Sequence, residues 1–353
     1  MSLIARLLNP FSNDIGIDLG TANSLVYLRG KGIIINEPSV VALNQKTGQV
    51  VAVGAKAKEM LGRTPQHIRA VRPLVNGVIS DFEVTEEMIG YFLNKAQRGT
   101  RALVGPRVVI GVPSGITNVE SRAVRDAARN AGAREVHIVE EAIAAAIGMR
   151  LPIHEARASM IVDIGGGTTD IAILSLNGIV TSKNIHTAGD KLNNDIVSHL
   201  RNEFKIVIGE TTAEDLKFAV CSLLEQKESL EEPVRGRDLV TGLPKEVIIT
   251  DEDIRDAVAV SIDSIIEGIK EVLENSPPTV VADIMKVGIN LTGGGALIYG
   301  IPELLSSMLE LPVNVANDPL TSVVRGTGFI VEKLEDYNDI LLDEDALPTF
   351  ENS

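Results

Sequence analysis

Two glycine-bearing hairpins, one near the start of the chain and one near its middle, constrain the fold more than any other feature of the sequence. The first bends at Asp18-Leu19-Gly20-Thr21 between two short apolar strands. The second bends over residues 163–170, and its acid, Asp163, lies 145 positions after Asp18. Because each hairpin stands at the head of a half-chain, the repetition predicts a duplicated fold with two related lobes.

The length and composition agree with two hydrophobic cores. A chain of 353 residues exceeds what one core usually supports. With 44% hydrophobic residues, 31 Gly and 15 Pro, it suits an α/β protein with many tight turns. A strand is expected over 107–112, and helices over 118–131, 251–275 and 300–309. We therefore predict two lobes, each with a mixed β-sheet flanked by helices.

We expect the following division of the chain into domains. Residues 1–12 are expected to form an amphipathic helix, and 13–149 the first lobe, with a smaller subdomain at about 33–75. The second lobe is expected over 150–331, with a mostly helical, polar subdomain at about 184–248 and a return toward the first lobe near its end. The charge run at 225–232 is predicted to be solvated. Residues 332–353 are acidic and aperiodic, which predicts a loose tail.

Charge and cysteine content exclude several classes of protein. The formal net charge of -15 argues against a nucleic-acid partner, because phosphate binding needs clustered Lys and Arg. Cys221 has no companion thiol, which indicates a reducing compartment and predicts a cytoplasmic location. The sequence has no apolar run of spanning length and no secretory signal pattern. Any membrane contact is therefore expected to be local and apolar.

Three glycine-rich turns carry the candidate chemistry: 18–23, 163–170 and 291–296. Glycines let successive backbone amides approach phosphate oxygens, and carboxylates such as Asp18 and Asp163 suit the hydrated shell of Mg²⁺. One such turn alone is more often just a tight bend. The chain has neither a P-loop nor a Gly-x-Gly-x-x-Gly run that opens a helix. Together, the turns predict a nucleotide clamp made of two hairpins.

The three turns, in this order, resemble the phosphate-one, phosphate-two and adenosine motifs of the superfamily of actin, heat-shock chaperones and sugar kinases. Further segments narrow the resemblance to the MreB family of bacterial actins over about residues 13–331. These segments include Asn36-Glu-Pro-Ser-Val-Val-Ala, Met60-Leu-Gly-Arg-Thr-Pro, Gly77-Val-Ile-Ser-Asp-Phe, Gly111-Val-Pro-Ser-Gly, Gly209-Glu-Thr-Thr-Ala-Glu and Arg235-Gly-Arg-Asp-Leu-Val-Thr-Gly-Leu-Pro. The resemblance implies the actin-like ATPase fold, with ATP and Mg²⁺ in the cleft between the lobes.

Carried over residue by residue, the resemblance implies a set of nucleotide-binding residues. For the phosphates and the metal they are Asp18, Gly20, Thr21, Ala22, Asn23, Asp163, Gly165, Gly166 and Gly167, with Asp18 and Asp163 holding Mg²⁺ through water. For the nucleoside they are Glu214, Lys217, Gly293, Gly294, Gly295, Ala296 and Leu297. Without the resemblance, a Glu-x-x-Lys pair would be interpreted as an ordinary pair of opposite charges on the exposed surface of a helix. Both purines offer the same phosphates, so the sequence does not distinguish ATP from GTP.

Hydrolysis requires a carboxylate that orients or deprotonates water in line with the γ-phosphate. The resemblance selects Glu141, with Thr168 helping to position the water. Without the resemblance, Glu140 and Glu141 would be interpreted as two acidic residues at the start of a helix, where the helix dipole stabilises negative charge. The family usually has proline after this glutamate and this chain has Ala142, so the position of the carboxylate and the hydrolysis rate stay open.

Two apolar segments are candidates for membrane contact. The first eleven residues place Leu3, Ile4, Leu7, Leu8 and Phe11 at helical spacing, which predicts a helix that lies in the membrane surface; packing on the protein itself is the alternative. Leu103 and Val104 fall where the family has a second membrane-entering loop, and a buried turn is the alternative there. One such helix binds weakly, whereas many copies in a filament adhere together.

The resemblance also implies the partners. The chain is expected to polymerise with itself, in paired antiparallel protofilaments on the inner face of the cytoplasmic membrane, and to guide the cell-wall elongation machinery together with a RodZ-like bitopic protein. ATP is expected to favour assembly, and slow hydrolysis to weaken it. A small-molecule kinase would need a catalytic aspartate and a polar substrate pocket, and a chaperone ATPase would need a further domain after Val331. The sequence shows none of these.

Overall fold

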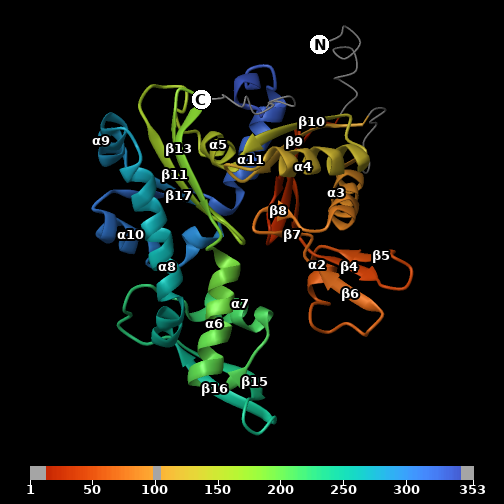
Figure 1. The fold of residues 1–353 in the computed structure, drawn as a ribbon, viewed down its shortest axis with the longest axis vertical. Coiled ribbons are helices and arrows are strands. Elements are labelled where there is room, and N and C mark those ends of the chain that lie inside the picture. Colours follow the sequence, from red (N-terminus) through yellow and green to blue (C-terminus); the bar gives the residue numbers. More distant parts are fainter. Residues whose placement is uncertain (1–12, 98–104, 343–353) are drawn as a thin grey trace, which may run out of the picture. The chain divides into compact units, whose positions relative to one another are not determined.

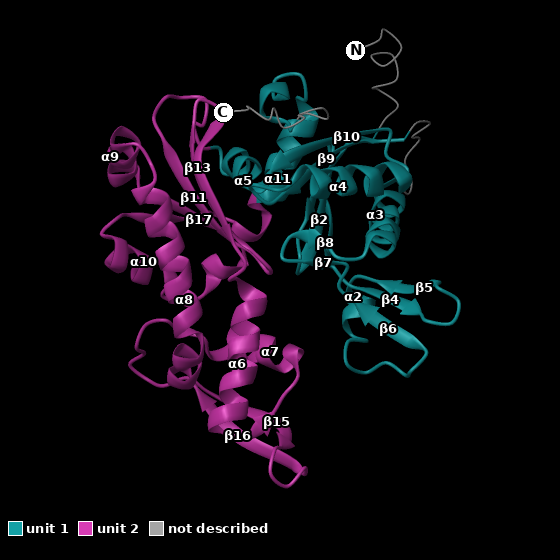
Figure 2. Ribbon diagram, in the orientation of Figure 1, with its two compact units in different colours: residues 1–150, 323–353 teal, residues 151–322 magenta. Residues whose placement is uncertain are grey.

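The computed structural model describes residues 13–97 and 105–342. They divide into two compact units, one of residues 1–150 with 323–353 and the other of residues 151–322 (Figure 2). Across the described residues, no helix is both long and apolar enough to cross a membrane.

Unit 1 is built on a five-stranded sheet with the order β10-β9-β1-β2-β3, of which β9 and β10 are labelled in Figure 1. Its strands are β1 Ile15–Leu19, β2 Asn23–Leu28, β3 Gly32–Pro38, β9 Arg107–Val112 and β10 Glu135–Glu140. Strands β1, β2 and β3 form an antiparallel meander, whereas β9 and β10 run parallel to β1. Every residue of β9 is buried, as expected for a central parallel strand that is covered on both faces.

Helices cover both faces of this sheet. They are α3 Phe82–Gln97, α4 Asn118–Asn130, α5 Glu141–Gly148 and α11 Ser322–Glu332. Ile15 and Ile17 point into the core that contains α3 and α4. Gly16, between them, faces α11 on the other side, where an added Cβ would lie 2.7 Å from Thr327 Oγ1. The start of α4 is fixed by a capping box between Thr117 and Glu120.

A smaller group of strands and a short helix extends unit 1. It contains β4 Val41–Asn44, β5 Val50–Val53, α2 Ala55–Lys58, β6 Ile68–Val71, β7 Leu74–Val75 and β8 Val78–Ile79. Strand β4 pairs antiparallel with both β5 and β6, and β7 pairs with β8.

Unit 2 has a five-stranded sheet with the order β13-β12-β11-β17-β18. Its strands are β11 Ser159–Ile164, β12 Thr169–Ser175, β13 Gly178–Ile185, β17 Ile289–Thr292 and β18 Val313–Val315. Here too a three-stranded antiparallel meander adjoins two parallel strands, so the strand order and directions repeat those of unit 1. The repeated hairpins of the sequence are the first two strands of each sheet, as the duplication predicts.

The remaining elements of unit 2 pack on this sheet or form a second one. They are α6 Gly189–Glu203, β14 Ile206–Val207, α7 Glu210–Val220, β15 Glu231–Asp238, β16 Pro244–Thr250, α8 Asp251–Glu274, α9 Pro278–Val287, η2 Gly294–Leu297, α10 Ile301–Leu309 and η3 Pro319–Thr321. Buried side chains of α6, α7 and α8 share one core with β11 and β12. Thr250 caps α8 through a capping box with Asp253.

Two expectations for these regions are wrong. The stretch from 184 to 248 is not mostly helical, because β14, β15 and β16 form a three-stranded antiparallel sheet within it. Residues 332–342 are not a loose tail. Leu334 and Ile340 are buried, η4 spans Asn338–Ile340, and the Leu342 amide donates to the carbonyl of Ile138 over 2.9 Å. Most of the charge run at 225–232 is exposed, as predicted.

The Glu37 carboxylate at the end of β3 joins three elements of unit 1. It accepts hydrogen bonds from Lys95 Nζ on α3 (2.7 Å) and from the Ala55 amide that begins α2 (2.9 Å). Burial raises the pKa of the Glu37 carboxyl, but these two bonds more than offset that effect and hold the pKa below its ordinary value of 4.5. The charged form therefore stabilises the fold.

We expect Glu37→Gln to lower the free energy of unfolding by about 1 kcal/mol near neutral pH. Because the folded-state pKa of Glu37 is depressed, this contribution is present above the unfolded-state pKa and is lost as the pH falls through the folded-state value. Urea titrations of both chains at about pH 7 and about pH 4 check this. The exposed Glu59→Gln is the control, and a difference that does not shrink at the lower pH would contradict the assignment.

Candidate functional site

The first glycine turn, between β1 and β2, is tied to its surroundings through its backbone and through Thr21. Ser39 donates from Oγ to the Gly20 carbonyl (2.5 Å) and from its amide to the Ala22 carbonyl (3.0 Å). The buried Thr21 hydroxyl accepts from the Gly77 amide over 2.9 Å. A Cβ on Gly20 would lie 2.6 Å from the Asn23 carbonyl oxygen, so the bend requires glycine. The turn is a rigid backbone loop.

Asp18 lies on β1, opposite Gly111 of the parallel strand β9. Burial raises the pKa of the Asp18 carboxyl to about 7. A carboxylate that has lost hydration in this way is stabilised by a cation, so Asp18 fits a role beside a hydrated Mg²⁺. No three His, Cys, Asp or Glu side chains in the described parts of the chain gather into a metal cage.

Two adjacent glutamates lie where β10 passes into α5. Glu140 is the N-cap of α5 and accepts from the Gly115 amide over 3.1 Å. Burial raises the pKa of Glu140 above its ordinary value in spite of that bond. Glu141 begins the helix and is half-buried beside the end of β9, since a Cβ on Gly111 would lie 3.4 Å from Glu141 Cγ. Gly111 is therefore a common neighbour: Asp18 of β1 pairs with it in the sheet, and the Glu141 side chain at the start of α5 lies beside it.

The helix start at Glu141 forms with Ala142 at the position where the sequence resemblance implies a proline. Ala142 occupies the second position of α5 and is fully buried. Glu140 has the extended backbone of an ordinary N-cap, with φ −68° and ψ 136°. The start of α5 therefore has ordinary N-cap geometry with alanine at this position.

The second glycine turn, in unit 2, lies against the N-terminus of α6. The Gly165 amide donates to the Thr168 carbonyl (2.9 Å), which closes the turn. The first amides of α6, those of Gly189 and Asp190, donate to the carbonyls of Gly165 (3.2 Å) and Gly166 (2.8 Å). These two bonds fix the second glycine turn to the start of α6, with Gly165, Gly166 and Gly167 in the turn itself.

Lys217 on α7 is anchored at this same turn. Its ammonium donates to the Gly189 carbonyl over 3.1 Å and lies 5.5 Å from the centre of the Phe218 ring. Glu214 is one helical turn earlier, and both side chains are half-buried. Lys217 therefore does not simply extend from the helix surface into solvent. It places a positive charge beside the second glycine turn.

The third glycine turn packs directly on the end of β11. Gly293 has φ +80°, and an added Cβ would lie 2.3 Å from Asp163 Oδ1. On Gly295 a Cβ would lie 2.2 Å from Ile164 Cγ2. These glycines are needed because the backbone of the third turn touches β11. Within unit 2 the structure thus brings together Asp163, the second turn, Lys217 and the third turn.

Sequence reasoning missed the residues that hold these turns in place. In unit 1 they are Ser39 and Gly77, and in unit 2 it is Gly189. All three act partly through backbone groups, which leave little signature in a sequence. The predicted membrane residues Leu3, Ile4, Leu7, Leu8, Phe11, Leu103 and Val104 lie outside the described residues.

Comparison with known proteins places the chain in one family over most of its length. The MreB/Mbl protein family matches residues 12–339. The cell shape-determining protein Mbl of Bacillus cereus is 47% identical over 325 residues, which cover 92% of this chain and 97% of that protein. The cell shape-determining protein MreB of Escherichia coli is 44% identical over 347 residues, covering 97% and 100%.

Solved structures agree on the fold. MreB5 of Spiroplasma citri, in a crystal structure bound to ADP, is 39% identical with a TM-score of 0.87, and the match covers 93% of this chain and 98% of that one. A MamK double helical filament is 23% identical with a TM-score of 0.77 over 91% and 99% of the two chains. The predicted actin-like fold is confirmed.

Proposed function

The chain belongs to the MreB/Mbl family of cell shape-determining proteins, and from this premise we propose that it is an ATP-dependent, membrane-associated filament that organises cell-wall synthesis and elongation. The observation that carries the proposal is the repeated hairpin. Two sheets of the same topology each present a glycine turn beside an acid, Asp18 in one and Asp163 in the other.

We propose that both glycine turns bind the phosphates of one ATP. The contributing residues are Asp18, Gly20, Thr21, Ala22, Asn23, Asp163, Gly165, Gly166 and Gly167. Glu214, Lys217 and the third turn, 293–297, are proposed to bind the nucleoside. Related MreB5 structures from Spiroplasma citri hold ADP or AMPPNP, which supports an adenine nucleotide.

For hydrolysis we propose Glu141 as the residue that orients and deprotonates the attacking water, with Thr168 helping to position that water. When bound, Mg²⁺ would neutralise phosphate charge, with Asp18 and Asp163 holding it through water. The raised pKa of Asp18 supports this role, because a dehydrated carboxylate gains most from a neighbouring cation.

For assembly we propose head-to-tail contacts between copies, which extend without closing into a ring, and pairing of antiparallel protofilaments. The apolar side chains of residues 1–11, together with Leu103 and Val104, are proposed to contact the inner face of the cytoplasmic membrane. A RodZ-like bitopic protein and the elongation machinery are the proposed partners. ATP binding favours the filament, and slow hydrolysis weakens it.

Sedimentation with liposomes tests this function. We expect the full chain to pellet with liposomes in ATP more than in ADP, and to form filaments visible by electron microscopy on the pelleted membranes. Leu7→Ser combined with Leu8→Ser should release it from the liposomes, because burial of each leucine is worth about 1.5–3 kcal/mol and many copies act together. Asn9→Ser is the matched control on the same segment and should pellet normally.

Each of three outcomes would contradict a different part of the proposal. Monomers under every condition, with phosphate transfer to a small acceptor, would indicate a kinase on the same fold. Filaments that pellet equally well without residues 1–11 would remove the membrane role of that segment. Filaments that form equally in ATP and ADP would remove the nucleotide dependence.

A further inference from the structure

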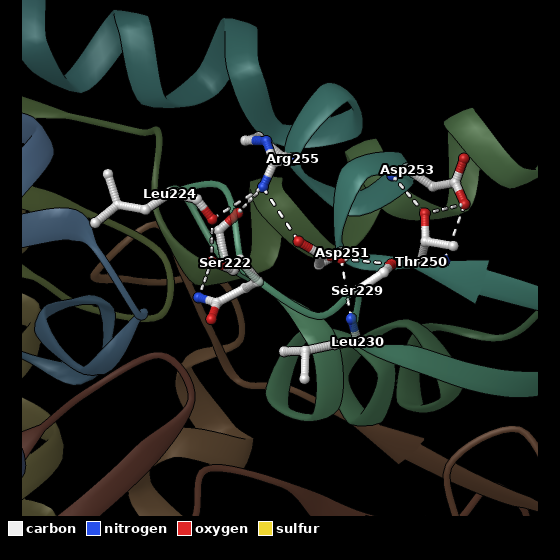
Figure 3. Close-up of polar contacts among 9 residues, drawn as sticks. Ser222, Leu224, Ser229, Leu230, Thr250, Asp251, Asp253 and Arg255 are labelled. Atoms are coloured by element: carbon white, nitrogen blue, oxygen red, sulfur yellow. Dashed lines mark hydrogen bonds and ion pairs between the residues drawn. The ribbon is translucent and has the colours of Figure 1, made fainter.

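The segment that joins α7 to β15, residues 221–230, is held by Arg255 in a polar network at the start of α8 (Figure 3). Arg255 Nη1 donates to the carbonyls of Ser222 and Leu224, both over 3.1 Å, and to Asp251 Oδ2 over 3.3 Å. One guanidinium thus fixes two backbone carbonyls that lie two residues apart. All three contacts are made by the same nitrogen, so this one group fixes the path of the backbone from Ser222 to Leu224.

Asp251 completes the network from the other side. Its Oδ1 accepts from the Leu230 amide over 3.1 Å and from Ser229 Oγ over 3.0 Å. The Asp251 side chain is almost fully buried, and that of Arg255 is three-quarters buried. The whole connecting segment is therefore attached at both of its ends to the first turn of α8.

The same segment also contacts the chain just after η2. The Leu223 amide donates to the Tyr299 carbonyl over 2.9 Å, and Ser222 forms an isolated parallel bridge with Tyr299. Gly300, with φ +83°, lies so close that an added Cβ would be 2.6 Å from Leu224 Cγ. Residues 222–224 are thus held between Arg255 on one side and residues 299–300 on the other.

This segment connects the two elements that we propose for the nucleoside. At its start, the Cys221 amide donates to the Lys217 carbonyl at the end of α7. Its contact with Tyr299 lies close to the third turn, because that turn ends at Leu297, two residues before Tyr299. The buried Leu216 of α7 and Ala296 of η2 belong to one core. A shift of residues 222–224 would therefore move α7 relative to the third turn.

We propose that Arg255 is a positioning residue for the nucleoside, which sets the spacing between Glu214 and Lys217 on α7 and the loop 293–297. The inference rests on the proposed nucleotide-binding function and deepens it. Arg255 acts through the backbone of residues 222–224. The phosphate turns have further anchors that do not involve residues 222–224: Ser39 and Gly77 in unit 1, and in unit 2 the Gly189 and Asp190 amides, which donate to the carbonyls of Gly165 and Gly166.

A purely structural role for Arg255 makes a different prediction. A variant that only lowers the folded fraction reduces apparent affinity for every ligand by the same factor. A variant that misplaces the nucleoside elements weakens ATP but leaves a ligand that consists only of phosphates unaffected. The ratio of affinities for ATP and for inorganic tripolyphosphate, both with Mg²⁺, separates the two.

We expect Arg255→Gln to weaken ATP binding about tenfold in calorimetric titrations, and tripolyphosphate binding less than about twofold. Arg255→Lys keeps a charged donor near Asp251 but on a shorter side chain with different geometry, so its loss should be smaller, about threefold. Gly300→Ala disturbs the same contact from the opposite side and should give the same selective loss even if Arg255→Gln does not fold. Arg235→Gln, at an exposed arginine of the same unit, is the control.

The outcomes are distinct. Equal weakening of both ligands, or no change in either, in Arg255→Lys and Gly300→Ala overturns the positioning role. Selective loss of ATP in these variants, with Arg235→Gln unchanged, supports it. A wild-type chain that binds neither ligand overturns the proposed function, and this inference with it.

Discussion

Replacing Glu141 with glutamine should slow ATP hydrolysis by about 100- to 1000-fold while ATP binding is retained. Glutamine keeps the size of the side chain but cannot take a proton from water. Glu141 is half-buried at the first position of α5, beside Gly111 and hence beside the strand position that Asp18 pairs with. The measurement is phosphate release at saturating ATP, together with an ATP titration to confirm binding.

Glu140 provides the matched control, because it is the same residue type one position earlier. Its carboxylate is engaged by the Gly115 amide as part of the turn that precedes α5. Glu140→Gln should therefore change turnover by less than about threefold, and act instead through a modest loss of stability. A larger loss of turnover in Glu140→Gln than in Glu141→Gln would mean that the catalytic assignment belongs to the other glutamate.

If the assignment holds, the glutamine variant should also stay assembled longer. Hydrolysis is the proposed step that weakens the filament, so a chain that binds ATP without cleaving it remains in the assembling state. Filaments of the variant should outlast those of the parent chain after ATP is depleted by dilution. Equal lifetimes would separate hydrolysis from disassembly.

Much of the fold could be predicted from the sequence wherever a strand or helix has a regular buried pattern. The strand at 107–112 is apolar and β-branched on both faces, and the structure has β9 at those residues. The helices predicted at 118–131 and 251–275 correspond to α4 and α8, and in the structure each has a polar residue that caps its start, Thr117 in one and Thr250 in the other. Such signals are local, so they survive without knowledge of the tertiary contacts.

The elements that were missed lack a local pattern. Strand β15 has one fully buried side chain, Val234, among charged and exposed residues, so its sequence shows no alternation that would predict a strand. The segment 332–342 is held by Leu334 and Ile340, which are separated by acidic residues and follow no helical period. Strand β15 pairs with β16 across a short hairpin, so what it lacks is an alternating pattern. The segment 332–342 contacts Ile138, about 200 residues earlier, which no short window of sequence contains.

The candidate site divides in the same way. The three glycine turns were recognisable because close backbone approach demands glycine, and the structure shows what Gly293 and Gly295 approach. The supports at Ser39 and Gly189 were not, because each acts at least partly through a backbone amide or carbonyl, and such groups leave little mark in a sequence. Glycines in a sequence thus indicate where the backbone packs closely against another segment. The sequence indicates less clearly which residues hold that backbone in place.

Gly326→Ala is expected to destabilise the protein by about 3 kcal/mol or more, the largest effect that we predict on stability. Gly326 lies on α11 where it crosses α5, and an added Cβ would lie 1.7 Å from the carbonyl oxygen of Ala144. The obstacle is backbone, so no side-chain rotation can relieve it. Two residues on, a Cβ at Gly328 would meet the ring of Tyr27 at 2.5 Å.

Thermal or urea unfolding of Gly326→Ala against Gly90→Ala checks this, because the two substitutions are chemically identical and both lie within helices of unit 1. At Gly90 of α3 the nearest atom to an added Cβ is 3.9 Å away, so alanine there should stabilise the helix by about 0.5–1 kcal/mol. Opposite signs for the two variants would show that the close crossing of α11 and α5 decides the result. Similar small effects in both would mean that the crossing can widen. In that case α11 does not fix α5, and Glu141 at the start of α5 must be positioned by β10 alone.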